Sequence, residues 1–519
     1  NNTAVGRAAL IANTTGNYNT AVGDQTLKTN TSGVQNTAVG QGALFFNTSH
    51  NNNAFGYNAL LSNTGASNCA FGSHALDNNT TASNNSAFGH RALDANTTGT
   101  ENTAVGSLAL DANTTGNRNT AVGYEAATAV TTAADVDAFG AFALNSNTTG
   151  TRNVGLGRSA LQVNTTASDN VAVGHEALKL NTGSDNTAVG SLALDANTTA
   201  AFNTAVGFRS LSANTTGTPN TALGGDALRE NTTGGNNVAV GSGALLSNTT
   251  ASNNTAVGRS ALLSNTTGAS NTAVGRHSLR SNTTGIHNTA FGANTLDANT
   301  TADRNTAIGH NSLNANTTGE DNTAVGKSAL ISNTTGVNNV AVGSGALDSN
   351  TTANNNVAVG TSALDANTTG HSTVCVGTDA GGAITTGVFN TAIGHQALDN
   401  CTTTSFNVAV GSGALGASTQ SANTAVGHNA GHNASSAANL TCVGTDAGQN
   451  ITTGSSNTCI GRSAGTQLVS GSNNIIIGSS AQASASNQSN QIILGNSSND
   501  DLRCNDQVIG ALSDARDKT

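Results

Sequence analysis

One short unit recurs from one end of this chain to the other, and it constrains the fold more than any other feature. A glycine ends each copy of an Asn-Thr-Ala-Val-Gly motif, and 30 such glycines occur between Gly6 and Gly495. Of the 29 intervals between them, 25 are 17 residues long and four are 16. A fixed period of this length is typical of a solenoid, in which each repeat forms one coil and contacts only its neighbours.

The consensus unit is seen in residues 322–338. Thr323–Val325 is a β-prone run between an asparagine and a glycine, so we expect a short strand there. The adjacent Ala329 and Leu330 are good helix formers. Neighbours on a strand would point to opposite faces. We therefore expect one helical turn that directs both side chains inward together with Val325, and a second strand is the alternative.

The end of each unit predicts how one coil leads to the next. Residues 333–336 read Asn-Thr-Thr-Gly and indicate a turn, because Asn and Gly tolerate a left-handed φ and Thr can bond the local backbone. Equivalent strands should pair in parallel and in register. Val would then stack on Val, Leu on Leu, and Asn on Asn in amide ladders. The sequence predicts an all-β protein, a parallel β-solenoid of about thirty 17-residue coils.

The composition predicts that several chains assemble. Aromatic residues make up 3% of the chain and charged residues 9%, and Trp and Met are absent. One Val, one Leu and two Ala per coil would bury little apolar area, so we expect several chains to share one core. The net charge of −10 is thinly spread, which argues against a nucleic-acid partner. No apolar run is long enough to predict membrane insertion.

The repeat changes in character along the chain. Residues 1–411 carry the Ala-Leu type of unit, and an Ala-Gly pair becomes frequent in residues 412–470. An early example is Gly381, in a copy where Ile384 also replaces the Asn of the turn. We expect the inward-pointing bulk to have moved along the coil, with a change of cross-section near residue 412. Residues 471–495 form a further section of Ser/Ala/Gln-rich coils.

The polar residues predict no metal centre, no cofactor and no catalytic constellation in the repeats. The 11 His lie at variable positions with no shared phase. Cys442 and Cys459 occupy the same phase of neighbouring coils, so we expect a ladder of small buried thiols, with a disulfide as the alternative. The six cysteines show no CxxC spacing and are Cys69, Cys375, Cys401, Cys442, Cys459 and Cys504.

Recurring threonines raise the question of ice binding, which requires a flat outer array of Thr side chains. In this chain the Thr of the strand is often replaced by Val, for example at Val340. That replacement predicts that the position faces inward, and it argues against an ice-binding function.

A separate motif lies at the end of the chain. The pattern Ser-Asp-x-Arg-x-Lys is matched by Ser513, Asp514, Arg516 and Lys518. This match resembles the start of the intramolecular chaperone domain of endosialidase-type phage tail spikes, tail fibres and related viral appendages. The resemblance implies that residues 496–513 form the strands of a C-terminal tip and that residues 514–519 begin the chaperone domain.

The same resemblance implies a self-cleavage reaction. In that family the chaperone assembles the fibre as a trimer and then cuts itself off at the Ser-Asp junction. Ser513 and Lys518 would inherit the catalytic roles in this cut, and the resemblance implies no other enzymatic activity. The remainder of such a domain is not in this chain.

A second resemblance concerns the repeats themselves. The general Asn-x-Ala-x-Gly-x-x-Ala pattern, and the Ser/Ala/Gln-rich coils around Gly478, are similar to the heads of trimeric autotransporter adhesins. Those heads are β-rolls with shorter repeats. The resemblance implies a homotrimer.

These observations lead to an expected function. We expect a structural shaft of a viral tail fibre on the virion surface, which supports attachment to a host receptor such as a cell-surface glycan. Other virion proteins would bind a segment ahead of Asn1. The alternative is a bacterial surface adhesin or an extracellular matrix filament. A polysaccharide-cleaving enzyme is disfavoured, because no coil breaks the repeat to present paired carboxylates.

Overall fold

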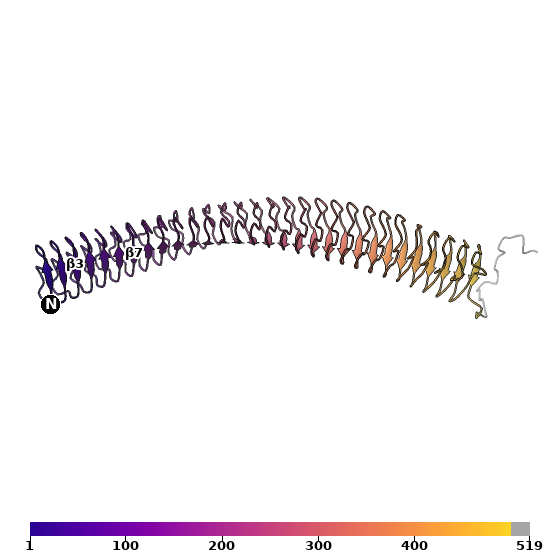
Figure 1. Cartoon of the computed structure of the whole chain (residues 1–519), viewed down its shortest axis with the longest axis horizontal. Coiled ribbons are helices and arrows are strands. Elements are labelled where there is room, and N and C mark those ends of the chain that lie inside the picture. Colours follow the sequence, from indigo (N-terminus) through magenta and orange to yellow (C-terminus); the bar gives the residue numbers. More distant parts are fainter. Residues whose placement is uncertain (500–519) are drawn as a thin grey trace, which may run out of the picture. The chain divides into compact units, whose positions relative to one another are not determined.

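The computed structural model describes residues 1–499, which fall into two units. Unit 1 comprises Asn1–Asn305 and contains 18 strands, and unit 2 begins at Thr306 and contains 12. All the regular elements among residues 1–499 are short strands, and none is a helix. Each unit is an all-β, parallel β-solenoid (Figure 1).

The strands of unit 1 are β1 (Thr3–Val5), β2 (Thr20–Val22), β3 (Thr37–Val39), β4 (Asn53–Phe55), β5 (Cys69–Phe71), β6 (Ser86–Phe88), β7 (Thr103–Val105), β8 (Thr120–Val122), β9 (Asp137–Phe139), β10 (Val154–Leu156), β11 (Val171–Val173), β12 (Thr187–Val189), β13 (Thr204–Val206), β14 (Asn220–Leu223), β15 (Asn237–Val240), β16 (Thr255–Val257), β17 (Thr272–Val274) and β18 (Thr289–Phe291). Those of unit 2 are β19 (Thr306–Ile308), β20 (Thr323–Val325), β21 (Val340–Val342), β22 (Val357–Val359), β23 (Val374–Val376), β24 (Thr391–Ile393), β25 (Val408–Val410), β26 (Thr424–Val426), β27 (Thr441–Val443), β28 (Thr458–Ile460), β29 (Ile475–Ile477) and β30 (Ile492–Leu494).

Strand pairing follows the repeat without a slip. Within each unit every strand pairs in parallel with the strand of the next coil, and equivalent residues face each other, as Ala4 does with Ala21 and Ala324 with Ala341. The predicted parallel, in-register pairing is confirmed.

The four 16-residue copies keep the same register because they lose a residue in the turn. In a 17-residue coil the Asn96 amide donates to the carbonyl three residues on, whereas Asn47, Asn63 and Asn181 donate to the carbonyl two residues on. The fourth short coil shows the same shortening, with Ser418 donating to Gln420 O. A deletion in the turn leaves the strand phase unchanged.

In most three-residue strands only the middle residue points into the coil. In β20, Ala324 is fully buried, whereas Thr323 and Val325 are partly exposed. Successive side chains of a strand point to opposite faces, so Thr and Val both lie on the outer face. The predictions that Val325 and the strand Thr face inward were wrong. The inside of the coil is narrow, and it admits the small Ala rather than the branched Val.

The predicted one-turn helix at Ala329-Leu330 is also absent. Ser328 and Leu330 have positive φ values of 58° and 53°, and Ala329 lies between them without one. Because left-handed and right-handed residues alternate here, successive backbone amides point to different neighbouring coils. Ser328 N–H donates to His310 O of the preceding coil and Leu330 N–H donates to Ala346 O of the following coil, each at 3.0 Å. A helix would instead direct every amide to the carbonyl four residues before.

The left-handed residue still brings both side chains inside, as predicted. Ala329 and Leu330 are fully buried, and so are Leu313 and Leu347 in the neighbouring coils. A left-handed conformation costs a non-glycine residue about 1–2 kcal/mol. Burying a Leu side chain returns about 1.5–3 kcal/mol, and the amide hydrogen bond to the next coil adds to this.

Two ladders of buried asparagines complete the interior, as the repeat predicts. In the first ladder Asn333 Nδ2 donates to Asn316 Oδ1 at 2.8 Å, and Asn350 Nδ2 donates to Asn333 Oδ1 at 2.7 Å. In the second ladder the backbone N–H of Asn339 donates to Asn322 Oδ1 at 3.0 Å. The inward side chains are therefore covered within a single chain, so the expectation of a core shared among chains loses its physical reason.

Candidate interaction surface

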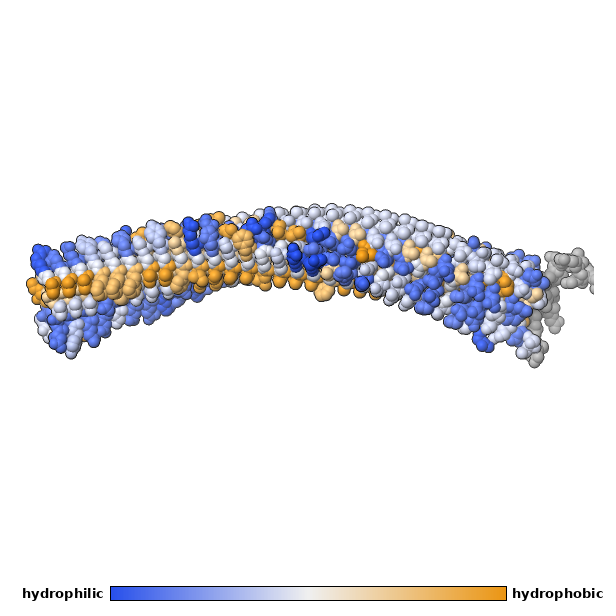
Figure 2. Space-filling model, in the orientation of Figure 1, coloured by the Kyte–Doolittle hydropathy of each residue, from blue (hydrophilic) through white to orange (hydrophobic). Residues whose placement is uncertain are grey.

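The outward residues of the strands form a continuous exposed surface on each unit, which we call the sheet face. It consists of the residues that flank the inward-pointing middle residue of each strand, such as Thr103 and Val105 of β7. Equivalent residues are aligned by the parallel register, so each position produces a row that runs from coil to coil. Figure 2 shows this alignment on unit 1, where an apolar stripe follows the strands.

The row that follows the middle residue is apolar in every strand. In β1–β30 it contains only Val, Ile, Leu and Phe. Many of these side chains are exposed, including Val105 at 38%, Phe139 at 37% and Phe291 at 56%. Contiguous exposed apolar surface of this kind marks interaction sites on soluble proteins.

The row that precedes the middle residue is mostly Thr and Val, with Ile in the last two strands. Asp137 is the one charged residue on the sheet face among residues 1–499. Depletion of charge is the compositional signal of the centre of a protein interface. Both rows therefore fit a surface that another macromolecule covers.

Stacked aromatic rings interrupt the Val row in unit 1. The Phe55 and Phe71 rings are parallel within 10° with centroids 4.4 Å apart, and Phe71 and Phe88 follow at 5.1 Å. The parallel register places these rings on top of one another. Phe is enriched at protein interfaces, and its large apolar surface would give this part of the sheet face the strongest contact.

Apart from Asp137, the charged residues among residues 1–499 lie in the segments between strands, and several of them pair with a residue of the neighbouring coil. Arg118 Nε lies 2.7 Å from Asp135 Oδ1, and Arg152 Nε lies 2.6 Å from Asp169 Oδ1. The hydrogen bond from each arginine lowers the pKa of its partner carboxyl. These exposed pairs contribute little stability, but they keep charge away from the sheet face.

The cysteines within residues 1–499 are all free thiols. Cys442 and Cys459 face each other in β27 and β28, so the thiol ladder is confirmed and the alternative disulfide is wrong. Burial raises the pKa of the Cys375 thiol well above its ordinary value. A buried thiol of this kind is an unreactive core residue rather than a nucleophile.

The two residues assigned to self-cleavage, Ser513 and Lys518, lie outside the described residues, as does Cys504. So do the proposed chaperone start at 514–519 and all of the tip after residue 499. Within residues 1–499, no group of three or more His, Cys, Asp or Glu residues is arranged to hold a metal ion. No helix among these residues is long and apolar enough to cross a membrane.

Sequence reasoning missed the sheet face because it placed Val inside the coil. A signal was present: the middle strand position is Ala in nearly every copy, whereas the third position varies among Val, Ile, Leu and Phe. A narrow interior selects one small residue, and an outer row tolerates different sizes. Protein-family models give no match to this chain, and the curated proteins give none either.

Proposed function

We propose that this chain forms the shaft of a homotrimeric fibre, a host-attachment appendage of the tail-fibre kind carried on a virion surface. The observation that carries the proposal is the sheet face, which in β1–β30 bears an unbroken apolar row and a single charged residue, Asp137, and is repeated on strand after strand. A monomer would leave this whole surface in water.

The way the chains associate follows from the completed interior. Each coil buries its own Ala, Leu and Asn side chains, so partner chains have no core left to share. Three copies can instead bring their sheet faces together around a common axis, with the Val and Phe rows between them. The loop segments, which carry the ion pairs, would then form the outside of the fibre.

Light scattering on the native protein tests the proposal, and a mass of three chains is expected. Replacing Val105, Val122 and Phe139 with Lys places three charges in the proposed interface, so this variant should dissociate. The matched control replaces Thr115, Thr132 and Thr149 with Lys, which adds the same charge at exposed turn positions of the same coils. A wild-type monomer, or equal behaviour of the two variants, would refute the trimer.

The strand threonines support a second candidate function. They lie on the outer face in register, as Thr103 does with Thr120, whereas an inward position was the reason for setting ice binding aside. We propose ice binding as the alternative use of the same surface. A measurable thermal hysteresis that disappears in the Val105, Val122 and Phe139 variant, together with a monomeric mass, would favour it over the fibre.

The bacterial alternative, a surface adhesin or an extracellular filament, would use the same shaft. It differs from a viral fibre in the segments that flank the repeats. Sequencing the gene on both sides of residues 1–519 distinguishes a virion-anchoring segment and a chaperone from a signal peptide and a membrane anchor.

A further inference from the structure

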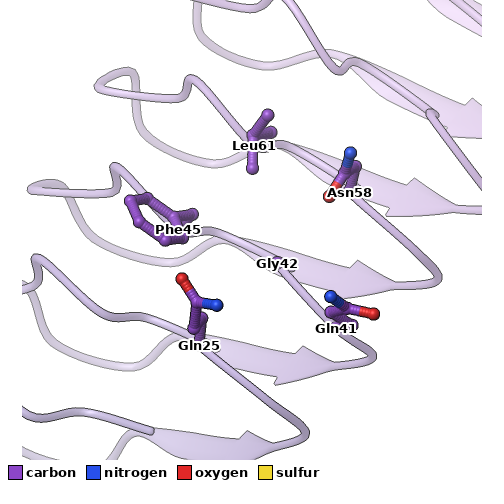
Figure 3. A pocket seen from close by; sticks show the side chains of 6 residues that line it. All are labelled: Gln25, Gln41, Gly42, Phe45, Asn58 and Leu61. Atoms are coloured by element: carbon purple, nitrogen blue, oxygen red, sulfur yellow. The ribbon is translucent and has the colours of Figure 1, made fainter. Parts of the chain in front are cut away.

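A small hollow opens on unit 1 in the turns that follow strands β2, β3 and β4, away from the outward residues of those strands. Side chains from three successive coils surround it (Figure 3). Its lining residues are Gln25, Gln41, Gly42, Phe45, Asn58 and Leu61.

The hollow exists because one side chain is missing from a row. Gly42 occupies the position that Gln25 fills in the coil before and Asn58 in the coil after. All three residues have a positive φ, at 71°, 58° and 55°, so the backbone does not require glycine there. A Cβ atom added to Gly42 would lie 2.5 Å from Asn58 Oδ1, which shows that the Asn58 amide leans into the vacant space.

Two of the polar groups around the hollow are available to a ligand. Among residues 1–499, the side-chain amides of Gln41 and Asn58 form no hydrogen bond with the protein. Each amide offers two N–H donors and one carbonyl acceptor. Gln25 is held in place, since its Oε1 accepts from Lys28 Nζ at 3.3 Å and its Nε2 donates to Asp24 Oδ2 at 3.4 Å.

An aromatic ring and an aliphatic side chain supply the apolar wall. Phe45 and Leu61 come from adjacent coils, and both line the hollow (Figure 3). The Phe45 ring is fixed by Lys28, whose ammonium lies 4.8 Å from the ring centroid, and by the edge contact with Phe46 at 4.5 Å. The wall is therefore in place before any ligand arrives.

Neutral amides beside an apolar wall fit one class of ligand. A pyranose ring presents hydroxyl groups that both donate and accept hydrogen bonds, and C–H groups that pack on apolar side chains. A charged ligand is not favoured, because the polar lining groups are all uncharged and the Lys28 ammonium already engages Gln25 and the Phe45 ring. A few neutral hydrogen bonds give weak binding at one site, and a fibre would strengthen it by presenting three copies.

We propose that this hollow is a binding subsite for the pyranose ring of a neutral glycan. As a receptor contact it rests on the proposed attachment function. The lining residues lie in the turns that follow the strands, so the subsite stays open when the sheet faces are covered.

Saturation-transfer NMR on the full chain tests the subsite with the methyl glycosides of glucose, galactose, mannose and N-acetylglucosamine as probes. We expect transfer to the ring protons of at least one probe, and at least a tenfold weaker affinity in Gly42→Asn. Asn already occupies this position with a positive φ at Asn58, so the variant fills the hollow without backbone strain. Gly243→Asn is the matched control, because Gly243 holds the same position of another coil with a φ of 66°.

No transfer to any of the four probes would overturn the subsite, and so would an affinity that Gly42→Asn leaves unchanged. Equal losses in the two Asn variants would overturn it as well, because they would indicate a general effect on the fold. These outcomes are distinct from failure of the fibre proposal, since light scattering reports the trimer whether or not a glycoside binds.

Discussion

Individual asparagines show how strictly each coil depends on the next. The Oδ1 atoms of Asn113 and Asn367 are buried without a hydrogen-bond donor. In both cases the next residue of the ladder is apolar, Val130 after Asn113 and Ile384 after Asn367. An acceptor left unpaired in the interior costs about 1–3 kcal/mol. Each apolar replacement thus leaves one orphaned carbonyl oxygen on the coil before it. The Oδ1 atoms of Asn30 and Asn164, which precede the short coils of Asn47 and Asn181, are also unpaired.

The break at Val130 should be repairable by one substitution. We expect Val130→Asn to raise the free energy of unfolding by about 1 kcal/mol, because its amide can donate to Asn113 Oδ1 and its own Oδ1 can accept from Asn147. Urea denaturation measures the change. The matched variant Ile384→Asn should lower stability instead, because the Ile384 side chain fills space beside Gly381. Equal effects of the two variants would contradict this account.

At the scale of the coil, three copies carry a larger side chain in the strand and a smaller one at the inward Leu position. In these copies Gly replaces the inward Leu and Cys replaces the strand Ala: Gly381 accompanies Cys375, Gly448 accompanies Cys442, and Gly465 accompanies Cys459, whereas the coil of Gly431 keeps Ala425 in its strand. A Cβ atom added to Gly381 would lie 2.5 Å from Cys375 Sγ, and one added to Gly448 would lie 2.6 Å from Cys442 Sγ. The thiols occupy the volume that the Leu side chain fills elsewhere, a replacement that the repeat pattern did not predict.

This exchange predicts how mutations in one coil combine. Gly381→Leu should lower the free energy of unfolding by about 1–3 kcal/mol, because the added side chain overpacks the coil against Cys375 and Ile384. The backbone is not the obstacle, since Leu398 adopts a φ of 55° where Gly381 has 62°. Adding Cys375→Ala and Ile384→Asn restores the consensus coil and should recover most of the loss. Purely additive losses in a urea-denaturation cycle would show that the three sites are not coupled.

Much of the coil could be predicted from the repeat, and the failures share one cause. Periodicity alone predicted the strands, the parallel register and the Asn ladders, because each follows from stacking identical units. The predicted helical turn at Ala329-Leu330 was wrong, because nothing in the residue type of Leu330 favours a positive φ. The outward direction of Val325 was missed because a three-residue strand can present either its middle or its ends to the interior. Only the width of the coil decides between them, and width is a property of the whole cross-section.

The sheet face and the hollow differ in how far the sequence could have predicted them. The small residue, mostly Ala, beside a variable apolar position could have indicated the sheet face. The hollow depends on a glycine at a position that other coils fill with many residue types, and on how far Gln41, Phe45 and Asn58 extend. The hollow is not visible in the repeat pattern, because it arises from contacts between side chains of different coils.

At the scale of the whole molecule, the few ionisable side chains determine how the stability of the fold depends on pH. Burial raises the pKa of the Asp365 carboxyl, and the nearby Asp379 and Asp348 charges add to the effect. The folded state therefore favours the protonated form, and ionised Asp365 lowers stability above that raised pKa. Asp169 behaves in the opposite way, because the hydrogen bond from Arg152 lowers the pKa of its carboxyl.

Two substitutions that remove a carboxylate charge should thus have opposite effects on stability. Asp365→Asn is expected to raise the urea midpoint at pH 7, and the difference should vanish as the pH falls below about 3.9, the pKa of an Asp in an unfolded chain. Asp169→Asn is expected to lower the midpoint at pH 7, and its effect should vanish only below the lowered pKa of the folded state. A pH-independent effect of either variant would mean that it acts through packing rather than through charge.

We expect cleavage of the chain after Ser513 to be coupled to assembly of the trimer. A serine hydroxyl needs a base to become a nucleophile, and Lys518 can serve only if burial shifts its ammonium to the neutral form. A chaperone domain that buries Lys518 in its own trimer would therefore couple the cut to correct assembly. We predict that the full gene product is cleaved between Ser513 and Asp514, and that Ser513→Ala abolishes the cut while light scattering still gives three chains. Lys518→Arg should also abolish it, because an arginine keeps its charge and cannot act as the base. Intact-mass measurement decides the question: a mature fibre chain that continues past Asp514, or a Lys518→Arg variant that is still cut, would remove Ser513 and Lys518 from these roles.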